Sequence, residues 1–474
     1  MKNYVCVLLI FFTSSVLGQK TKQEVLKSID SKNDQYSNIA HRIWEFAEVG
    51  YQEVKSSELL QETLTQAGFK IEKGVAGIPT AFVATYGSGK PVVAILAEFD
   101  ALPGVSQDAV PEVKPVPGRT AGHACGHHLF GTASSAAGIA VKEWMIANKK
   151  SGTIRVYGTP AEEGGSGKVY MVRDGLFSDV DVVLHWHPGS QNSASFGSSL
   201  SNKSGKFRFT GVASHAAASP ERGRSALDAV EAMNAMVNMM REHVPSETRI
   251  HYVITRGGEA PNVVPAFAEV YYYVRHPDRN LVVSIWDRVV KAAEGAALGT
   301  ETKMEVEVTG GVYNLLANEI LSKAIDNNLR VIGGYTFTDT EKDFAQKIQK
   351  TFTTTPPKLE STSTIVDFGA NGDKGGSTDV GDVSWVVPTA GLTSATWVPG
   401  TAAHSWQAVA AGGTSIGSKG MMIAAKAIAA TAIDLFEQPA LIQNAWKEFN
   451  GRRPADFKYD ALVGARKPAL DYRK

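Results

Sequence analysis

A continuous apolar run, Val92-Val-Ala-Ile-Leu96, constrains the fold of this chain more than any other segment. A run without alternating polar residues is typical of a strand buried on both faces of a helix-covered sheet. It leads into the acidic segment Glu98-Phe-Asp100, and residues 153–157 and 180–186 form similar segments that also end in polar residues. Helical patterns separate these segments. The chain is therefore predicted to have an α/β fold with a site along the strand ends.

A second segment, Gly122-His-Ala-Cys-Gly-His-His-Leu-Phe-Gly131, holds three of the chain's eleven histidines. Cys125 and His127 stand two residues apart, and the glycines beside them permit the tight turns that bring two side chains together. A thiolate and an imidazole are preferred ligands of zinc and similar ions. The alternative interpretation is a glycine-rich turn whose histidines are incidental.

Candidate metal ligands recur at the predicted strand ends and in nearby loops. They are Asp100, Cys125, His127, Glu162, Glu163, His185, His187 and His404. Any one of them is more often structural, but a set spread over several loops at one sheet edge indicates a metal site. Adjacent Glu162 and Glu163 suit metal-assisted hydrolysis, because one carboxylate can bind a metal while its neighbour acts as a general base.

The pattern changes between residues 205 and 308. Strands are predicted over 206–210, 248–254, 266–274 and 303–308, with helices over 225–241 and 281–297. This βαββαβ order is that of a ferredoxin-like unit and suggests an inserted domain. The methionines of the first helix are interpreted as core filling.

The first eighteen residues combine Lys2, an apolar stretch from Tyr4 to Phe12, and small residues before Gln19. This arrangement predicts a secretory signal peptide, and an N-terminal membrane anchor is the alternative. Removal of the leader would leave Cys125 as the only cysteine, and metal ligation would explain why a single thiol is tolerated after export.

A length of 474 residues predicts two domains, or one large domain with an insertion. Lys plus Arg equals Asp plus Glu at 48 each, so the charge balance does not indicate a nucleic-acid partner. No later segment is apolar enough to predict a membrane span.

The other expected elements follow from hydrophobic periodicity. They are a strand over 81–85, helices over 25–47, 57–67, 132–148, 318–332, 340–352 and 415–436, a loop over 361–382, a strand over 383–387, and a basic, poorly packed tail from Arg452.

The chain resembles the M20 metallopeptidase family, subfamily D, over residues 35 to 437. The segments that carry the resemblance are Glu98-Phe-Asp-Ala-Leu-Pro-Gly104, Gly122-His-Ala-Cys-Gly-His127, Pro160-Ala-Glu-Glu-Gly-Gly-Ser-Gly-Lys168, Trp186-His-Pro188, Ser214-His-Ala-Ala217, Pro261-Asn-Val-Val264, Ser377-Thr-Asp-Val-Gly-Asp-Val-Ser-Trp385 and His404-Ser-Trp406.

The resemblance implies a zinc-peptidase-type catalytic domain with a mixed sheet flanked by helices, interrupted by a ferredoxin-like lid that also mediates dimerisation. With residues 1–18 as signal peptide, the catalytic domain would occupy 19–202 and 313–474, and the lid 203–312. The implied partners are a small-molecule amide substrate and either a second copy or a related chain.

The resemblance also implies the site residues. Two divalent ions, Zn²⁺ or Mn²⁺, would be held by Cys125, His127, Glu163, His187 and His404. Glu162 would be the general base, and His215 would reach a neighbouring active site to stabilise the oxyanion. Asn262 and Arg275 match positions that hold the carboxylate of the substrate.

Two positions stay open. Many relatives have Asp where this chain has His128, so the carboxylate partner of the metal-binding histidine is either missing or supplied by Asp100. His185 and His187 lie on the same face of one predicted strand, and His187 is preferred as the ligand because it directly precedes Pro188.

The implied activity is that of a metal-dependent amidohydrolase that cleaves N-acyl or N-aroyl amino acids of the aminobenzoyl-glutamate type. A dipeptide or another acyl-amino-acid conjugate is the alternative substrate. A non-catalytic, metal-binding partner subunit is the alternative from a different class. The pair Glu162 and Glu163 argues against that last alternative, since a scaffold needs no general base.

Overall fold

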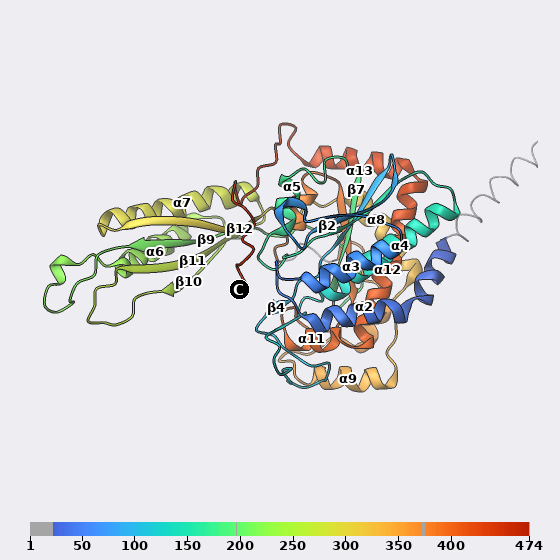
Figure 1. Cartoon of the computed structure of the whole chain (residues 1–474), viewed down its shortest axis with the longest axis horizontal. Helices are drawn as coiled ribbons and strands as arrows, with labels where there is room; N and C mark the ends of the chain where they lie inside the picture. Colours follow the sequence, from blue (N-terminus) through green and yellow to red (C-terminus); the bar gives the residue numbers. More distant parts are fainter. Residues whose placement is uncertain (1–21, 196, 371–374, 474) are drawn as a thin grey trace, which may run out of the picture.

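The computed structural model describes residues 22–195, 197–370 and 375–473. The predicted signal peptide lies outside these residues. A catalytic domain and an elongated lid are joined at one edge (Figure 1). Among the described residues, no helix combines the length and apolar character that a bilayer crossing requires.

The catalytic domain is built on a mixed seven-stranded sheet in the order β1-β2-β6-β3-β7-β13-β8. Its strands are β1 (Lys70–Lys73), β2 (Phe82–Ser88), β3 (Val92–Ala97), β6 (Gly152–Gly158), β7 (Val182–Gly189), β8 (Ser193–Ser195) and β13 (Thr389–Ala395). Strand β3 is parallel to both β6 and β7, and β13 is parallel to β7. Every residue of β3 is buried, as the apolar run predicts. The carboxyl ends of these four strands therefore meet at one sheet edge.

Helices cover the sheet and place the loops around that edge. They are α2 (Asn33–Phe46), α3 (Val54–Gln66), α4 (His127–Ala147), α5 (Gly167–Arg173), α8 (Glu319–Ile332), α9 (Asp339–Gln349), α10 (Val380–Ser384), α11 (Trp406–Gly412), α12 (Ser415–Glu437) and α13 (Pro439–Arg452). Two central helices, α4 and α12, pack against each other and against the sheet, and most of their residues are buried. A short pair, β4 (Leu102–Pro103) and β5 (Ala121–Gly122), closes the loop between β3 and α4.

The lid has the predicted ferredoxin-like arrangement. Its elements are β9 (Ser201–Thr210), α6 (Ala226–Met240), β10 (Arg249–Arg256), β11 (Phe267–His276), α7 (Arg279–Gly299) and β12 (Lys303–Val312). The four strands form an antiparallel sheet in the order β10-β11-β9-β12, and both helices pack on one face of it. Met233 and Met240 are buried in the separate core of the lid, in agreement with their interpretation as core filling, whereas Met236 and Met239 of the same helix are exposed.

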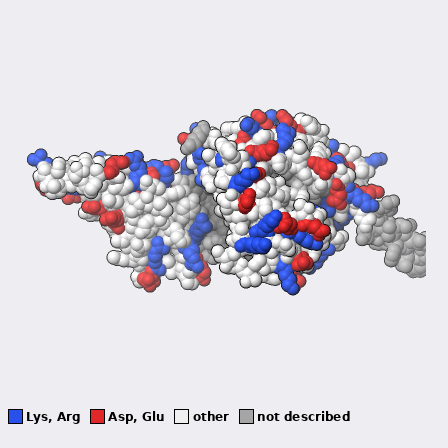
Figure 2. All heavy atoms as spheres, turned by 90° about the horizontal axis from the view of Figure 1, so that it is seen from below, with Lys and Arg blue, Asp and Glu red and all other residues white. Residues whose placement is uncertain are grey.

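Acidic and basic side chains are interspersed on both domains in the view of Figure 2. Side chains of both signs are therefore present on each domain in this view, as the equal total numbers of acidic and basic residues lead us to expect.

The predicted strand over residues 383–387 is wrong. Val380 and Val383 are buried at helical spacing within α10, and the strand β13 begins only at Thr389. Sequence patterns conceal β13 because it consists of small residues. A Cβ atom at Gly391 would lie 2.5 Å from the ring of His185, so a larger side chain does not fit there.

The predicted poor packing of the tail is also wrong. Ala461, Leu462 and Val463 are buried, and Leu462 packs against Gly311 of the lid strand β12. The hydroxyl of Tyr459 donates a 2.8 Å hydrogen bond to the buried carboxylate of Asp382. The segment from residue 454 to 473, called the tail segment below, is therefore a structural part of the domain junction.

Candidate metal centre and active site

A cavity of about 990 Å³ lies between the strand ends of the catalytic domain and the lid. Its catalytic-domain wall carries Glu98, Cys125, Glu162, Glu163 and other polar residues of the strand-end loops. Its lid wall comes from β9, β11 and β12. A cavity thus lies along the strand ends, where a site is predicted, and residues of both domains line it.

The glycine-rich segment after β5 turns sharply into α4. Gly126 has a φ of 76°, and a Cβ atom there would lie 2.6 Å from the ring of Pro188. Only glycine fits this conformation and this contact without strain. The helix begins at His127, five residues before the predicted start, so His127 occupies its first turn beside the preceding Cys125.

His127 lies between the buried carboxylates of Asp100 and Glu98. Its Nδ1 donates a 2.8 Å hydrogen bond to Asp100, and its Nε2 lies 3.1 Å from Glu98 without hydrogen-bond geometry. Burial opposes the charged imidazolium, but Cys125, Asp100 and Glu98 together raise the pKa of His127 well above its ordinary value. The bond to Asp100 leaves Nε2 facing Glu98, which lines the cavity, and a carboxylate behind the other ring nitrogen is typical of a metal-binding histidine.

Asp100 therefore supplies the carboxylate partner that the sequence left open. Its second oxygen accepts a 2.9 Å hydrogen bond from the backbone N–H of Glu163. His128 lies on another side of α4, where its Nε2 donates to the carbonyl of Gly412. Burial lowers the pKa of His128 well below its ordinary value, in keeping with a neutral core histidine.

The loop with Glu162 and Glu163 is held in an unusual backbone conformation. Ala161 and Ser166 have φ values of 59° and 60°, which are uncommon for residues with a side chain. Glu53, fully buried, accepts a 2.8 Å hydrogen bond from the N–H of Ala161 and holds the start of the loop. Strained backbone that is fixed by such contacts is typical of functional sites.

His404 approaches Glu163 from the loop before α11. Its Nε2 lies 3.1 Å from Glu163 Oε1, and this contact with the carboxylate raises the pKa of His404. The φ of His404 is 61°, and its N–H donates to the carbonyl of Ala124. The last loop is thus tied directly to the segment that carries Cys125.

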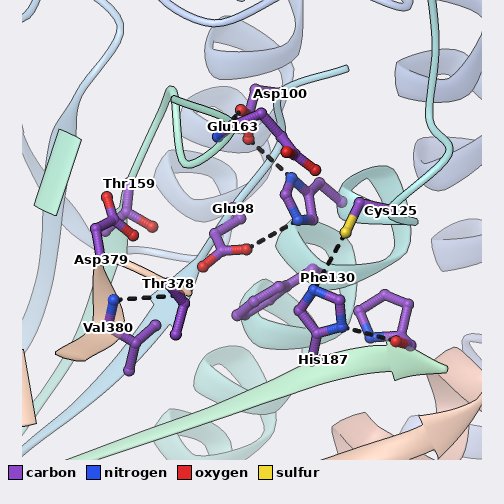
Figure 3. Close-up of polar contacts among 12 residues, drawn as sticks. Glu98, Asp100, Cys125, Phe130, Thr159, Glu163, His187, Thr378, Asp379 and Val380 are labelled. Carbon is purple, nitrogen blue, oxygen red and sulfur yellow. Dashed lines mark hydrogen bonds and ion pairs between the residues drawn. The ribbon is translucent and has the colours of Figure 1, made fainter. Parts of the chain in front are cut away.

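Strand β7 supplies His187. Its Nδ1 donates to the carbonyl of Pro188, which leaves Nε2 directed at the sulfur of Cys125, 3.4 Å away (Figure 3). His185, two residues earlier, also lines the cavity, but its ring packs against Gly391. Of the two histidines, His187 is the one beside the other predicted ligands.

The donor atoms fit a metal centre. Three groups have ligand atoms within 4.8 Å of one another: Cys125 with His127 and His187, Cys125 with Glu163 and His404, and Glu98 with His127 and Glu162. The structure thus brings together all five predicted ligands and Glu162. Sulfur, imidazole and carboxylate donors suit zinc and related divalent ions. Two of the groups share Cys125, which suits two neighbouring ions.

Burial raises the pKa of the Cys125 thiol in the free protein, so a bound cation would be needed to hold its thiolate form.

Glu162 lies in the same cluster. Burial, together with the neighbouring Glu98 and Glu163, raises the pKa of its carboxyl well above the ordinary value. A carboxylate with a raised pKa binds a proton readily, which suits a general base that also returns the proton.

Sequence reasoning missed a buried ionic network behind these residues. Lys168 is fully buried, and its Nζ lies 2.7 Å from both Glu98 and Asp379. The two carboxylates outweigh burial and raise the pKa of Lys168. The lysine was visible only as part of a glycine-rich segment, and periodicity gives no signal for a buried cation. Its partner Glu98 was visible as the acidic residue at the end of β3.

The lid residues separate into two groups. Arg275 on β11 lines the cavity. His215 and Asn262 do not line it in this chain; they lie together beyond the other end of the lid sheet, where the N–H of Ala216 donates to the carbonyl of Asn262. The register pairs Ser201 with His276 at the near end and Thr210 with Phe267 at the far end. Nine residue steps separate these ends, about 30 Å in a strand.

We expect Lys168→Met to lower the free energy of unfolding by about 3–5 kcal/mol, because it leaves two buried carboxylates without their cation. Urea unfolding of the full chain would measure the change. Lys347→Met is the matched control, since its exposed pair with Asp343 contributes less than about 1 kcal/mol. Equal effects of the two substitutions would contradict the assigned role of the network.

Comparison with known proteins identifies relatives of the chain. Residues 199–301 match the family model of the peptidase dimerisation domain, M20_dimer. The chain is 42% identical to the B-type subunit of the p-aminobenzoyl-glutamate hydrolase of Escherichia coli, over 90% of this chain and 95% of that protein. It is 30% identical to the Xaa-Arg dipeptidase of Mus musculus, over 90% of this chain and 92% of that one.

Solved structures show the same fold. The aminobenzoyl-glutamate utilization protein of Klebsiella pneumoniae matches with a TM-score of 0.60 at 17% identity, covering 87% of this chain and 98% of that one. The Bacillus subtilis YXEP protein, a dinuclear metal-binding peptidase from the M20 family, matches with a TM-score of 0.58 at 17% identity, covering 86% and 99%. Sequence identity over nearly the whole chain, together with this fold, shows that the chain belongs to the M20 family of metal-dependent peptidases and amidohydrolases.

Proposed function

We propose that this protein hydrolyses the amide bond of N-acyl or N-aroyl amino acids of the aminobenzoyl-glutamate type. The observation that carries the proposal is the convergence of Cys125, Glu163 and His404 beside the carboxylate of Glu162 in one cavity. The similarity to a p-aminobenzoyl-glutamate hydrolase supports the choice of substrate.

The proposal includes two divalent ions, Zn²⁺ or Mn²⁺. The ligands would be Cys125, His127, Glu163, His187 and His404. Each of them belongs to one of the sets of residues whose ligand atoms lie within 4.8 Å of one another. When bound, such ions supply Lewis acidity that polarises an amide carbonyl and makes water a better nucleophile at neutral pH.

The protein's own groups move the proton and position the substrate. Glu162 takes the proton of the attacking water and returns it to the departing amine. Arg275, on the lid wall of the cavity, pairs with the carboxylate of the amino-acid product through its planar fork of donors. Asn262 would contribute to the same carboxylate from a partner's lid.

We further propose that His215 completes the site of a neighbouring protomer. His215 lies about 30 Å along the lid from the end that joins the catalytic domain. This position suits delivery across a dimer, where its imidazole would donate to the developing oxyanion. The partner is either a second copy or a related chain. The Escherichia coli relative is named as one of the subunits of its hydrolase, which supports a related chain. Residues 1–18 support export to the periplasm or the medium.

A dipeptide is the alternative substrate, favoured by the similarity to the Xaa-Arg dipeptidase of Mus musculus. The full chain loaded with Mn²⁺ or Zn²⁺ should hydrolyse p-aminobenzoyl-glutamate faster than a Gly-Arg dipeptide, and chelation should abolish the activity. A reversed preference would establish the alternative. Absence of turnover on both, even with a related M20 chain added, would overturn the proposed activity.

The ligand assignment predicts unequal effects of two neighbouring substitutions. His187→Ala should reduce the metal content by at least one ion per chain and abolish turnover, because its Nε2 lies beside Cys125. His185→Ala should retain both ions, and Cys125→Ser should resemble His187→Ala. Elemental analysis of purified chains measures this directly. Metal loss in His185→Ala with full occupancy in His187→Ala would reverse the assignment.

Delivery of His215 across a dimer predicts complementation. His215→Ala and Glu162→Ala chains should each be nearly inactive, since loss of one oxyanion donor costs roughly 10²–10³ in kcat. If the dimer is homomeric, mixing them should restore about a quarter of the activity, because about half the dimers are mixed and each has one complete site. No recovery, with exchange of protomers demonstrated by differently tagged chains, would place the action of His215 within its own chain.

A further inference from the structure

The last two described residues of the tail segment lie at the active site. The hydroxyl of Tyr472 and the Nη2 of Arg473 both donate to the carbonyl of Glu163, at 3.0 and 2.9 Å. Arg473 also lines the cavity that contains the predicted metal ligands. A residue of the tail segment therefore contacts the same loop that carries the general base.

Several contacts fix the tail segment in this position. The ring of Tyr472 packs edge-on against Tyr51, and its hydroxyl occupies the space that a Cβ atom of Gly50 would need. Gln52 donates a 2.7 Å hydrogen bond to the carbonyl of Leu470. The absence of a side chain at Gly50 thus allows Tyr472 to reach Glu163, and Tyr472 holds the adjacent Arg473 beside the cavity.

The charges around the cavity give Arg473 a distinct role. Among the described residues that line it, Arg275 and Arg473 are the only arginines, and no lysine lines it. The other charged groups of the wall include Glu98, Glu162, Glu163 and Asp379. Apart from the histidines at the predicted metal centre, the two guanidinium groups are the cationic side chains of the wall with which a substrate with two carboxylates can pair, and the carboxylates of the wall repel it unless metal ions neutralise them.

The two arginines belong to different walls of the cavity. Arg275 lies on the lid strand β11, whereas Arg473 is attached to the catalytic domain. The guanidinium of Arg473 is exposed and has five N–H donors, so its bond to Glu163 leaves donors for a ligand. If Arg275 holds one carboxylate of the amino-acid product, Arg473 is available for a second.

We propose that Arg473 is a specificity-determining residue that binds the side-chain carboxylate of a dicarboxylic amino acid, while Arg275 binds its α-carboxylate. The cavity then favours amides of glutamate or aspartate over amides of neutral amino acids. This inference rests on the proposed amidohydrolase function and adds Arg473 as the residue that distinguishes a second carboxylate from a neutral side chain.

The test compares p-aminobenzoyl-glutamate with p-aminobenzoyl-glutamine, which has the same shape and lacks the second charge. Wild-type chain should prefer the glutamate compound. Arg473→Gln should lower kcat/KM for it by about 10- to 100-fold, chiefly through KM, because a charge-assisted hydrogen bond is lost. The value for the glutamine compound should change by less than about threefold, and Arg473→Lys should retain part of the preference.

Two controls separate recognition from structure. Lys467→Gln removes another cation of the tail segment, one that is exposed and does not line the cavity. It should leave the preference unchanged. Tyr472→Phe removes one hydrogen bond to Glu163 and should change both substrates alike.

Equal losses on both substrates in Arg473→Gln, no loss on either, or no preference in the wild-type chain would each overturn the inference. Binding is measured separately by calorimetry in a Glu162→Gln background, with and without Arg473→Gln. Tighter binding of the glutamate compound, lost with Arg473→Gln, would uphold the inference even if turnover failed. Equal binding of the two compounds would overturn it even if the chain proved to be an amidohydrolase.

Discussion

The hydrogen bond from His127 to Asp100 is the constraint on which the rest of the site depends. It joins the end of β3 to the first turn of α4, and the second oxygen of Asp100 extends the connection to the N–H of Glu163. One fully buried carboxylate thereby fixes three segments that are distant in sequence. Burial alone would raise the pKa of Asp100, but its contact with His127 outweighs this, so the pKa is lowered and the carboxylate stays charged. A charged acceptor at this place orients the imidazole so that its Nε2 faces Glu98, which lines the cavity.

Much of this arrangement follows from the sequence, because it depends on strand ends. A buried run such as Val92–Leu96 predicts a central strand, and the polar residues after it must then lie at the sheet edge. The same reasoning brings Glu163 and His187 to that edge, and the structure places both there. The position of His404 does not follow from the strand ends, because His404 lies in a loop whose place no local sequence pattern determines. Its residue type made it a candidate ligand, and the family motif His404-Ser-Trp406 supplied its assignment.

The features that sequence reasoning missed have physical reasons. Lys168 is a cation in the core, and only the three-dimensional proximity of Glu98 and Asp379 makes its burial tolerable. Strand β13 consists mostly of small residues, which carry little strand signal, and at Gly391 the ring of His185 leaves no room for a side chain. The tail segment is basic and rich in turns, which is typical of exposed chain, yet its few apolar residues are buried at the domain junction.

The position of the tail segment connects recognition to the relation between the two domains. Arg466 contacts Val308 on the lid, while Arg173 of α5 donates to the carbonyl of Arg466. The segment is thus bonded to both domains before it reaches Glu163. A dicarboxylic ligand held by Arg275 and Arg473 would bridge the same two domains from inside the cavity. Any change in the angle between lid and catalytic domain would alter the separation of the two guanidinium groups. Selectivity for the second carboxylate therefore depends on how firmly the tail segment fixes that angle, as well as on the charge of Arg473.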